Sequence, residues 1–247
     1  MICDFHSHAL PKIDDGAKDL DMSIEMLKKS KEQGVTDVIL TPHCYPYSQR
    51  DITDFLVKRK RAYDMLYNIS DIPNLHMGCE LHLTGDVTKY FDLKELCIAN
   101  THYLLLEMPT TPWNDNTIEF AYKLTLMGIT PVIAHDERNF HQKQELRNLL
   151  YDLDVLIQIN APSLSIHSMR KEVDKMLRLG MGHVIGSDMH NLTSRKPCFE
   201  TAQKQIKKRY GEDCWDYFMT NAEKILNDEK ISYKDFKSFK KKSLLLL

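Results

Sequence analysis

Hydrophobic and polar positions follow the same order in three separate segments of the chain. Each segment runs from a helical pattern through a glycine into a short apolar run, and a His or Asp follows the run. The apolar residues of these runs occupy consecutive positions, which is typical of parallel strands covered by helices on both faces. Gly34, Gly128 and Gly180 stand where the end of a helix favours a left-handed residue. The three segments, each predicted to be a helix followed by a strand, are 28–43, 121–135 and 175–190.

Four further apolar runs complete a set of seven predicted strands, at 2–5, 75–79, 103–106 and 154–159. The first helix can begin at Asp19 or Asp21, since either is a suitable N-cap. Seven strands that alternate mostly with helices, in a chain of 247 residues, predict an α/β fold. We expect a (β/α) barrel of seven units. A doubly wound open sheet is the alternative, but the chain has no G-x-G-x-x-G turn that would favour it.

The chain shows no low-complexity linker, so residues 1–247 are expected to form a single domain. The end of the chain, from about residue 228, is rich in lysine and closes with KKKSLLLL. Four leucines are too few to anchor a chain in a bilayer, so we expect a frayed end.

Residues that bind metal ions stand where the predicted strands end. The C-terminal ends of barrel strands meet at one face, where active sites form. In H-x-H (His6 and His8) both imidazoles project to the same side of an extended strand, and D-x-H (Asp188 and His190) repeats that spacing. Each of these residues alone is weak support for a metal site. Because all of them stand at the ends of predicted strands, together they indicate one shared site. The candidate ligands are His6, His8, His43, Glu80, Glu107, His135, Asp188 and His190, with Asn160 at the end of a further strand.

Mixed imidazole and carboxylate ligands suit Mn, Fe or Zn better than copper or calcium. Eight ligands exceed the needs of one ion, so two or three ions that share carboxylates are expected. Glu80 and Glu107 are the carboxylates best placed to be shared. The remaining histidines are interpreted as structural, with His82 left open.

The net charge and the cysteine content limit which partners and which cellular compartment are expected. The formal charge of −2 gives the whole chain no attraction to nucleic acid or to an anionic membrane. No stretch approaches the roughly 20 apolar residues that span a bilayer, and the N-terminus is polar too early for a secretory signal. The six cysteines show no C-x-x-C spacing, so we expect reduced thiols and a cytoplasmic protein.

The stretch HCYPYSQR, residues 43–50, matches the H-C-x5-R pattern of phosphatases that use a cysteine nucleophile. A loop of that kind wraps phosphate with successive backbone N–H groups. Pro46 has no N–H, and Tyr45 and Tyr47 add bulk where phosphate would lie. We therefore interpret His43 as a metal ligand and Cys44 as an ordinary neighbour.

Several motifs resemble, in order and spacing, those of the polymerase-and-histidinol-phosphatase (PHP) family. The resemblance covers about residues 1–195 and is closest to the bacterial metal-dependent tyrosine-protein phosphatases encoded with capsule and exopolysaccharide genes. It implies a distorted (β/α)7 TIM-like barrel and a three-metal cluster on the eight ligands named above, with manganese as the expected metal and iron or zinc as alternatives. It also implies a protein-tyrosine phosphatase that is not cysteine-dependent. The motifs are FHSHALPKIDDGA, TPHC, GCE, LLLEMP, IAHDER and GSDMHN.

The resemblance also implies a substrate and the residues that face it. The substrate would be the phosphotyrosine-rich tail of a partner bacterial tyrosine kinase that controls polysaccharide export. Asp15, Arg138 and Arg195 would lie on the substrate side as catalytic residues, and the two arginines would bind the phosphoryl group. The chain departs from the family pattern at Lys12, where a glycine is common, and at Asp136, where a proline is usual. Both departures are expected near the mouth of the site.

The implied reaction is direct hydrolysis by an activated water. Asp15 is the candidate acid, or it orders the loop or a water with Asp14. The arginines could instead form surface ion pairs. Two other functions compete with this one. The first is a PHP-type phosphoesterase for small phosphates such as histidinol phosphate or for nucleic-acid ends; the basic run 58–61 would favour nucleic acid, but we interpret it as the solvated face of an amphipathic helix. The second is a binding module with structural metals.

Overall fold

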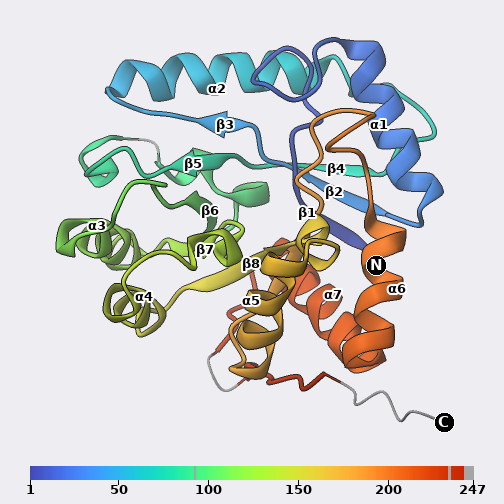
Figure 1. The fold of residues 1–247 in the computed structure, drawn as a ribbon. Coiled ribbons are helices and arrows are strands. Elements are labelled where there is room, and N and C mark those ends of the chain that lie inside the picture. Colours follow the sequence, from blue (N-terminus) through green and yellow to red (C-terminus); the bar gives the residue numbers. More distant parts are fainter. Residues whose placement is uncertain (92, 233–234, 242–247) are drawn as a thin grey trace, which may run out of the picture.

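The protein is described by a computed structural model that covers residues 1–91, 93–232 and 235–241. Its strands are all parallel and form a curled sheet with helices around it (Figure 1). The strands are β1 (Cys3–Ser7), β2 (Asp37–Leu40), β3 (His43–Cys44), β4 (Asn74–Met77), β5 (Glu80–His82), β6 (Tyr103–Glu107), β7 (Thr130–Ile133), β8 (Leu156–Asn160) and β9 (Val184–Gly186). The α-helices are α1 (Leu20–Glu32), α2 (Gln49–Asp64), α3 (Asp115–Leu126), α4 (Gln144–Tyr151), α5 (His167–Arg178), α6 (Phe199–Tyr210) and α7 (Glu212–Leu226).

The nine strands of the described residues make up seven staves, that is, seven strand positions along the curled sheet, as the sequence predicts. They are recorded in two sheets, in the orders β1-β2-β4 and β3-β5-β6-β7-β8-β9. Two residues separate β2 from β3, and two separate β4 from β5, so each pair is one interrupted stave. The N–H of Glu80 donates to the carbonyl of Pro42 at 3.0 Å, which continues the ladder across both interruptions.

The first and last staves are also linked. The N–H of His8 donates to the carbonyl of Met189 at 2.9 Å, and the N–H of Asp188 donates to the carbonyl of His6 at 2.8 Å. These bonds bring the two ends of the chain's ligand pattern, H-x-H and D-x-H, side by side. The predicted fold class is confirmed as an α/β fold with a curled parallel sheet of seven staves.

The predicted helix signals are present in the structure. Asp19 is the N-cap of α1, and its carboxylate accepts from the N–H of Met22 at 2.8 Å. Gly34, Gly128 and Gly180 have φ of 86°, 74° and 75°, the left-handed conformation predicted for them. The three glycines thus end the helices α1, α3 and α5 and turn the chain back into the strands β2, β7 and β9.

The end of the chain packs more closely than the sequence predicts. Ile231 and Phe239 are buried, and the N–H of Phe239 donates to the carbonyl of Leu177 at 2.7 Å. Two apolar side chains within 228–232 and 235–241 thus pack in the hydrophobic core. Residues 242–247, which include the four final leucines, lie outside the described residues.

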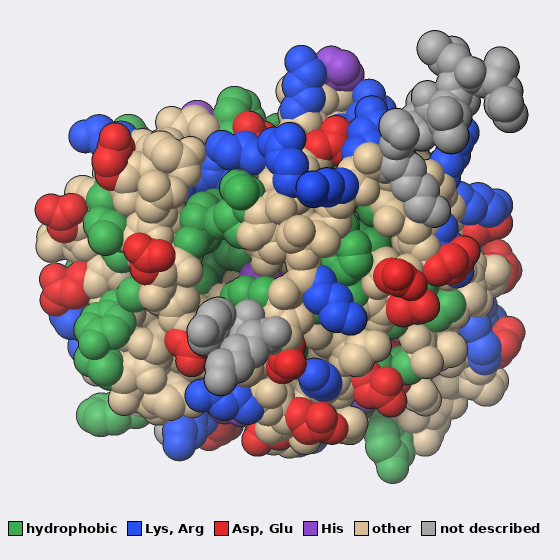
Figure 2. Space-filling model, turned by 90° about the horizontal axis from the view of Figure 1, so that it is seen from below, with side chains coloured by type: hydrophobic (Ala, Val, Ile, Leu, Met, Phe, Trp, Pro, Cys, Tyr) green, Lys and Arg blue, Asp and Glu red, His purple; other side chains and the backbone are tan. Residues whose placement is uncertain are grey.

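Surface charge is mixed. On the face seen from below, basic and acidic side chains are interspersed (Figure 2), in keeping with the formal charge of −2. Within the described part of the chain, no helix has both the length and the apolar character needed to cross a membrane.

Candidate metal centre

The curled sheet brings all eight predicted ligands to one region. His6 lies in β1, His43 and Glu80 begin β3 and β5, and Glu107 ends β6. The others lie within four residues after the ends of β1, β7 and β9, as expected for side chains at the C-terminal ends of parallel strands. Among the described residues, the nitrogen and oxygen atoms of these eight side chains and of Asp15 form four groups, within each of which all ligand atoms lie within 4.8 Å of one another. These groups are His8, Asp15, His43 and His190; His6, Glu80 and His135; His6, His8 and Asp188; and His43, Glu80 and Glu107.

Glu80 lies at the centre of these groups. Its Oε2 is 3.2 Å from Nε2 of His6, 3.3 Å from Nε2 of His8 and 3.0 Å from Nδ1 of His43. Its Oε1 is 2.8 Å from Nε2 of His135. Although these distances are short, Glu80 Oε2 and His43 Nδ1 are buried and form no hydrogen bond with any described residue. Buried polar atoms that face one another without hydrogen bonds fit cation ligands.

The electrostatics of the cluster also favour positive charge. Burial opposes ionisation of Glu80, but the surrounding histidines outweigh burial and hold the pKa of Glu80 well below its usual range. Burial similarly opposes protonation of His8, yet the hydrogen bond with Asp14 and the nearby carboxylate of Glu80 raise the pKa of His8 to about 10. Ionised carboxylates thus surround the imidazoles in a buried place, where a cation gains most from them.

Two residues behind the histidines hold the rings in position. The Asp14 carboxylate accepts from Nδ1 of His8 at 2.7 Å, which leaves Nε2 of that ring to face the cluster. Gln158 of β8 accepts from Nδ1 of His6 at 3.0 Å and from the N–H of His135 at 2.9 Å. Such partners fix the tautomer and the orientation of ligand rings. Asp14 was expected as a residue that could order the loop, whereas Gln158 was not predicted. Its one signal in the sequence is that it stands two residues before Asn160 in the same strand.

His82, which the sequence left open, contacts a predicted ligand. β5 and β6 pair in parallel with His82 opposite Glu107, and His82 Nδ1 lies 2.9 Å from Oε2 of Glu107. His82 is in none of the four groups of ligand atoms among the described residues. Its geometry suits a residue that orients Glu107.

At two glycines the backbone lies very close to a histidine of the cluster. A Cβ on Gly16 would lie 2.1 Å from the carbonyl oxygen of His8, and one on Gly186 would lie 2.4 Å from Cβ of His6. Any larger residue at either position would push a histidine out of place. His135 and Asp188 themselves have left-handed φ values of 35° and 53°, and such strained backbone clusters at functional sites.

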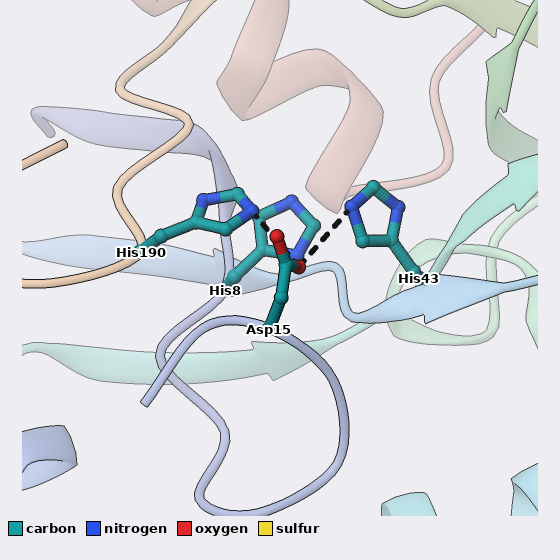
Figure 3. A group of neighbouring side chains, drawn as sticks. All are labelled: His8, Asp15, His43 and His190. Atoms are coloured by element: carbon teal, nitrogen blue, oxygen red, sulfur yellow. Dashed lines mark ion pairs between the residues drawn. The ribbon is translucent and has the colours of Figure 1, made fainter. Parts of the chain in front are cut away.

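Asp15 lies on the open side of the cluster, between two histidines (Figure 3). Its Oδ1 is 3.3 Å from Nε2 of His190 and 3.6 Å from Nε2 of His43, and its side chain is 65% exposed. With His8 these residues form one of the four groups, so Asp15 can serve as a ligand as well as face a substrate. A cavity of about 360 Å³ opens beside it, lined by Ile13, Asp14, Asp15, His43 and Tyr45.

Both predicted arginines contact the cluster. Nη2 of Arg138 and Nη2 of Arg195 each lie 2.7 Å from one oxygen of Asp188. The side chains are 42% and 38% exposed, so both remain partly accessible to solvent. Arg138 therefore pairs with a predicted ligand rather than with its chain neighbours Asp136 and Glu137.

Comparisons with known proteins identify the group to which this arrangement belongs. Residues 2–227 match the family described as "Capsular polysaccharide synthesis, CpsB/CapC". The chain belongs to the CpsB/CapC family. The predicted branch, capsule-associated tyrosine-protein phosphatases with a PHP-like metal-dependent structure, is thereby confirmed.

Similar members of the CpsB/CapC family span nearly the same length. The putative tyrosine-protein phosphatase CapC of Staphylococcus aureus is 34% identical over 93% of this chain and 92% of its own. The tyrosine-protein phosphatase YwqE of Bacillus subtilis (strain 168) is 33% identical over 92% of each chain. Tyrosine-protein phosphatase CpsB of Streptococcus pneumoniae is 30% identical over 92% of this chain and 99% of its own.

Solved structures agree with the fold. One, from a study of YwqE of B. subtilis and CpsB of S. pneumoniae as "unique metal-dependent tyrosine phosphatases", has a TM-score of 0.78 and 27% identity, and covers 96% of this chain and 99% of its own. The phosphotriesterase of Mycobacterium tuberculosis, at 10% identity, has a TM-score of 0.57 over 92% and 94% of the two chains. That second likeness shows the fold alone.

The residues that match H-C-x5-R do not have the geometry of a cysteine nucleophile with a phosphate-binding arginine. Cys44 is 2% exposed in the hydrophobic core, and burial raises the pKa of its thiol to about 12. Arg50, the arginine of the pattern, is exposed and pairs with Asp54 on α2. The thiol is therefore protonated near neutral pH, and the arginine of the pattern is paired on the helix surface, which agrees with the interpretation of Cys44 as an ordinary neighbour of His43.

Two expectations about neighbouring residues need correction. Asp136 was expected at the mouth of the site, but it is fully buried, and its carboxylate binds Arg147 at 3.3 Å and accepts from the hydroxyl of Tyr151 at 2.5 Å. This network joins the turn after β7 to α4. The basic run in α2 was expected to be a solvated face, and Lys58, Lys60 and Arg61 are exposed as expected. Arg59 is the exception, because it is buried and donates to the carbonyls of Gly78 and Glu95.

Lys12, the other departure from the family pattern, is exposed and has φ of 59°. This left-handed conformation costs a lysine more than a glycine. The preference of the family for glycine there thus has a backbone explanation.

Proposed function

We propose that this chain, a tyrosine-protein phosphatase of the CpsB/CapC family, hydrolyses phosphotyrosine on the tail of a partner bacterial tyrosine kinase and so regulates capsule or exopolysaccharide synthesis and export. The observation that carries the proposal is the group of ligand atoms around Glu80, open to a cavity and flanked by two arginines. The relatives, which match over nearly their whole length, are named as tyrosine-protein phosphatases.

The ions of a metal-dependent phosphatase would be held by the four groups of ligand atoms. Because His6, His8, His43 and Glu80 each belong to more than one group, two or three ions would share ligands, most simply through Glu80. We propose Mn as the metal, with Fe or Zn as alternatives that the same ligands accept. When bound, the ions would supply a water of lowered pKa and positive charge toward the phosphoryl oxygens.

The residues of the chain itself would bind and orient the substrate. Arg138 and Arg195 present planar guanidinium groups beside Asp188, and guanidinium suits bidentate contact with phosphoryl oxygens. The carbonyl of Arg195 accepts from the N–H of His190 at 2.8 Å, which fixes the loop that carries this arginine against the cluster. Asp15 lies at the cavity, where a carboxyl group can reach a leaving oxygen, and its role as the acid remains a proposal.

A second candidate, hydrolysis of small phosphates or nucleic-acid ends, would use the same ligands. Burial of Arg59 removes one charge from the basic run that favoured nucleic acid. A purely structural metal site would be closed by its ligands, whereas this cluster borders a cavity of about 360 Å³. Phosphotyrosine therefore remains the favoured substrate.

The test is a comparison of initial rates on three substrates with Mn added: a phosphotyrosine peptide, a phosphoserine peptide and histidinol phosphate. We expect kcat/KM to be highest for the phosphotyrosine peptide. A higher value for histidinol phosphate would contradict the proposal and favour a small-molecule phosphatase.

A further inference from the structure

The segment between β3 and α2 places one more side chain at the cavity. Side chains alternate along an extended strand, so His43 and Tyr45 project to one side and Cys44 to the other. The burial agrees with this alternation: Cys44 lies in the core, whereas Tyr45 is 46% exposed beside the cluster. None of the roles assigned above to the metal ligands, the arginines or Asp15 uses Tyr45.

The ring of Tyr45 is held from behind. Its centroid lies 5.2 Å from the ring of His43 and 5.1 Å from the ring of His82, so two imidazoles support it. The next residue is fixed as well, because the carbonyl of Pro46 accepts from the hydroxyl of Thr84. A supported ring with one open face is suited to stack against another ring.

Tyr45 and Ile13 supply the apolar surface of the cavity, and Asp14, Asp15 and His43 supply its polar surface. A cavity of about 150 Å³ with apolar walls can hold a benzene ring. The cavity beside the cluster, at about 360 Å³, has room for a phenyl ring that enters from the solvent side.

We propose that Tyr45 and Ile13 form an aryl-binding subsite, which receives the phenyl ring of phosphotyrosine while the phosphoryl group reaches the ligand cluster. This inference rests on the proposed function and gives a structural reason why the protein would prefer phosphotyrosine. The short side chain of phosphoserine has no ring to stack on Tyr45, so the subsite would favour aryl over alkyl phosphates. The hydroxyl of Tyr45 has no part in this preference.

The test uses Tyr45→Ala, Tyr45→Leu and Tyr45→Phe proteins loaded with Mn to equal metal content. Tyr47→Ala is the matched control, because Tyr47 is 74% exposed, belongs to the same segment and does not line the cavity. Two readouts are taken: kcat and KM on phosphotyrosine and phosphoserine peptides, and calorimetric affinity for phenylphosphonate and methylphosphonate.

We expect Tyr45→Ala and Tyr45→Leu to weaken phenylphosphonate binding and raise KM for phosphotyrosine by roughly fivefold or more. Methylphosphonate affinity should stay within twofold, and Tyr45→Phe and Tyr47→Ala should behave like wild type. Equal losses for both phosphonates, or loss of the preference in Tyr45→Phe, would overturn the subsite. Failure of the proposed function looks different, since the wild-type protein would then not hydrolyse the phosphotyrosine peptide.

Discussion

Replacement of Asp14 tests whether the cluster depends on the residues behind its histidines. The Asp14 carboxylate accepts three bonds: its Oδ2 binds Nδ1 of His8 at 2.7 Å and the N–H of His43 at 3.0 Å, and its Oδ1 binds the N–H of Gly16 at 3.0 Å. Asn can keep an oxygen on only one side, so Asp14→Asn turns an amide N–H toward one of these donors. Ala keeps none of the three bonds.

The size of the effect follows from the bond to His8. A hydrogen bond to a charged group contributes about 1.5–3 kcal/mol, and each 1.4 kcal/mol is a factor of ten in affinity. Loss of the partner that orients a ligand ring should therefore weaken Mn binding by roughly 10–100-fold. Asp14→Ala should reach the upper part of that range, and Asp14→Asn the lower part.

The assay is a titration of chelator-treated protein with Mn, followed by activity at saturating Mn. Asp21→Asn on α1 is the control, because it removes an exposed carboxylate of the same charge without contact to the cluster. If Asp14→Ala binds Mn as tightly as Asp21→Asn does, the hydrogen bond to His8 does not support the metal centre and this reasoning is wrong.

Three further predictions follow from the geometry. Cys44→Ser should retain most activity on phosphotyrosine, whereas His43→Ala should lose on the order of a hundredfold in rate, because a misplaced ligand misplaces the reacting groups. Arg138→Ala and Arg195→Ala should raise KM or lower kcat on the same peptide while metal content, measured by elemental analysis, stays unchanged. Burial lowers the pKa of His183 from 6.5 to about 3, so below pH 6.5 the unfolded chain takes up a proton that the folded protein does not. Stability should fall as the pH drops from 6.5 to about 3, by at most about 1.4 kcal/mol per pH unit, and urea unfolding of His183→Phe should show a shallower dependence.

Each of these predictions has an opposite outcome. A Cys44→Ser protein that binds metal normally but is inactive would make Cys44 the functional residue of the pair. Wild-type kinetics in both arginine variants would leave the arginines as surface ion pairs. Equal slopes of stability against pH for wild type and His183→Phe would mean that His183 is not held neutral by its burial.

Local patterns predicted much of the fold. Apolar runs and left-handed glycines act over a few residues, so seven staves and the ends of α1, α3 and α5 were visible in the sequence. The eight candidate ligands were also visible, because strand ends repeat along the chain. The interruptions between β2 and β3 and between β4 and β5 were not predicted, since the turn at Pro42 and Gly78 depends on how the sheet curls.

Contacts between distant segments account for what the sequence did not predict. Gln158 binds His6 across 152 positions of the chain, and no local pattern marks a glutamine inside an apolar strand. Asp136 binds Arg147 and Tyr151 in the interior, although its motif led us to expect it near the mouth of the site. Phe239 is likewise buried, and its N–H bonds to the carbonyl of Leu177, contacts that a lysine-rich composition cannot reveal.

The most direct measurement takes chelator-treated protein, adds Mn in steps, and records bound metal and the initial rate on a phosphotyrosine peptide in the same samples. We expect no hydrolysis of the peptide without metal, and a rate that rises as two or three ions bind to each chain. Full activity in the chelated protein, or fewer than one ion bound after Mn is restored, would contradict a metal-dependent phosphatase built on this cluster.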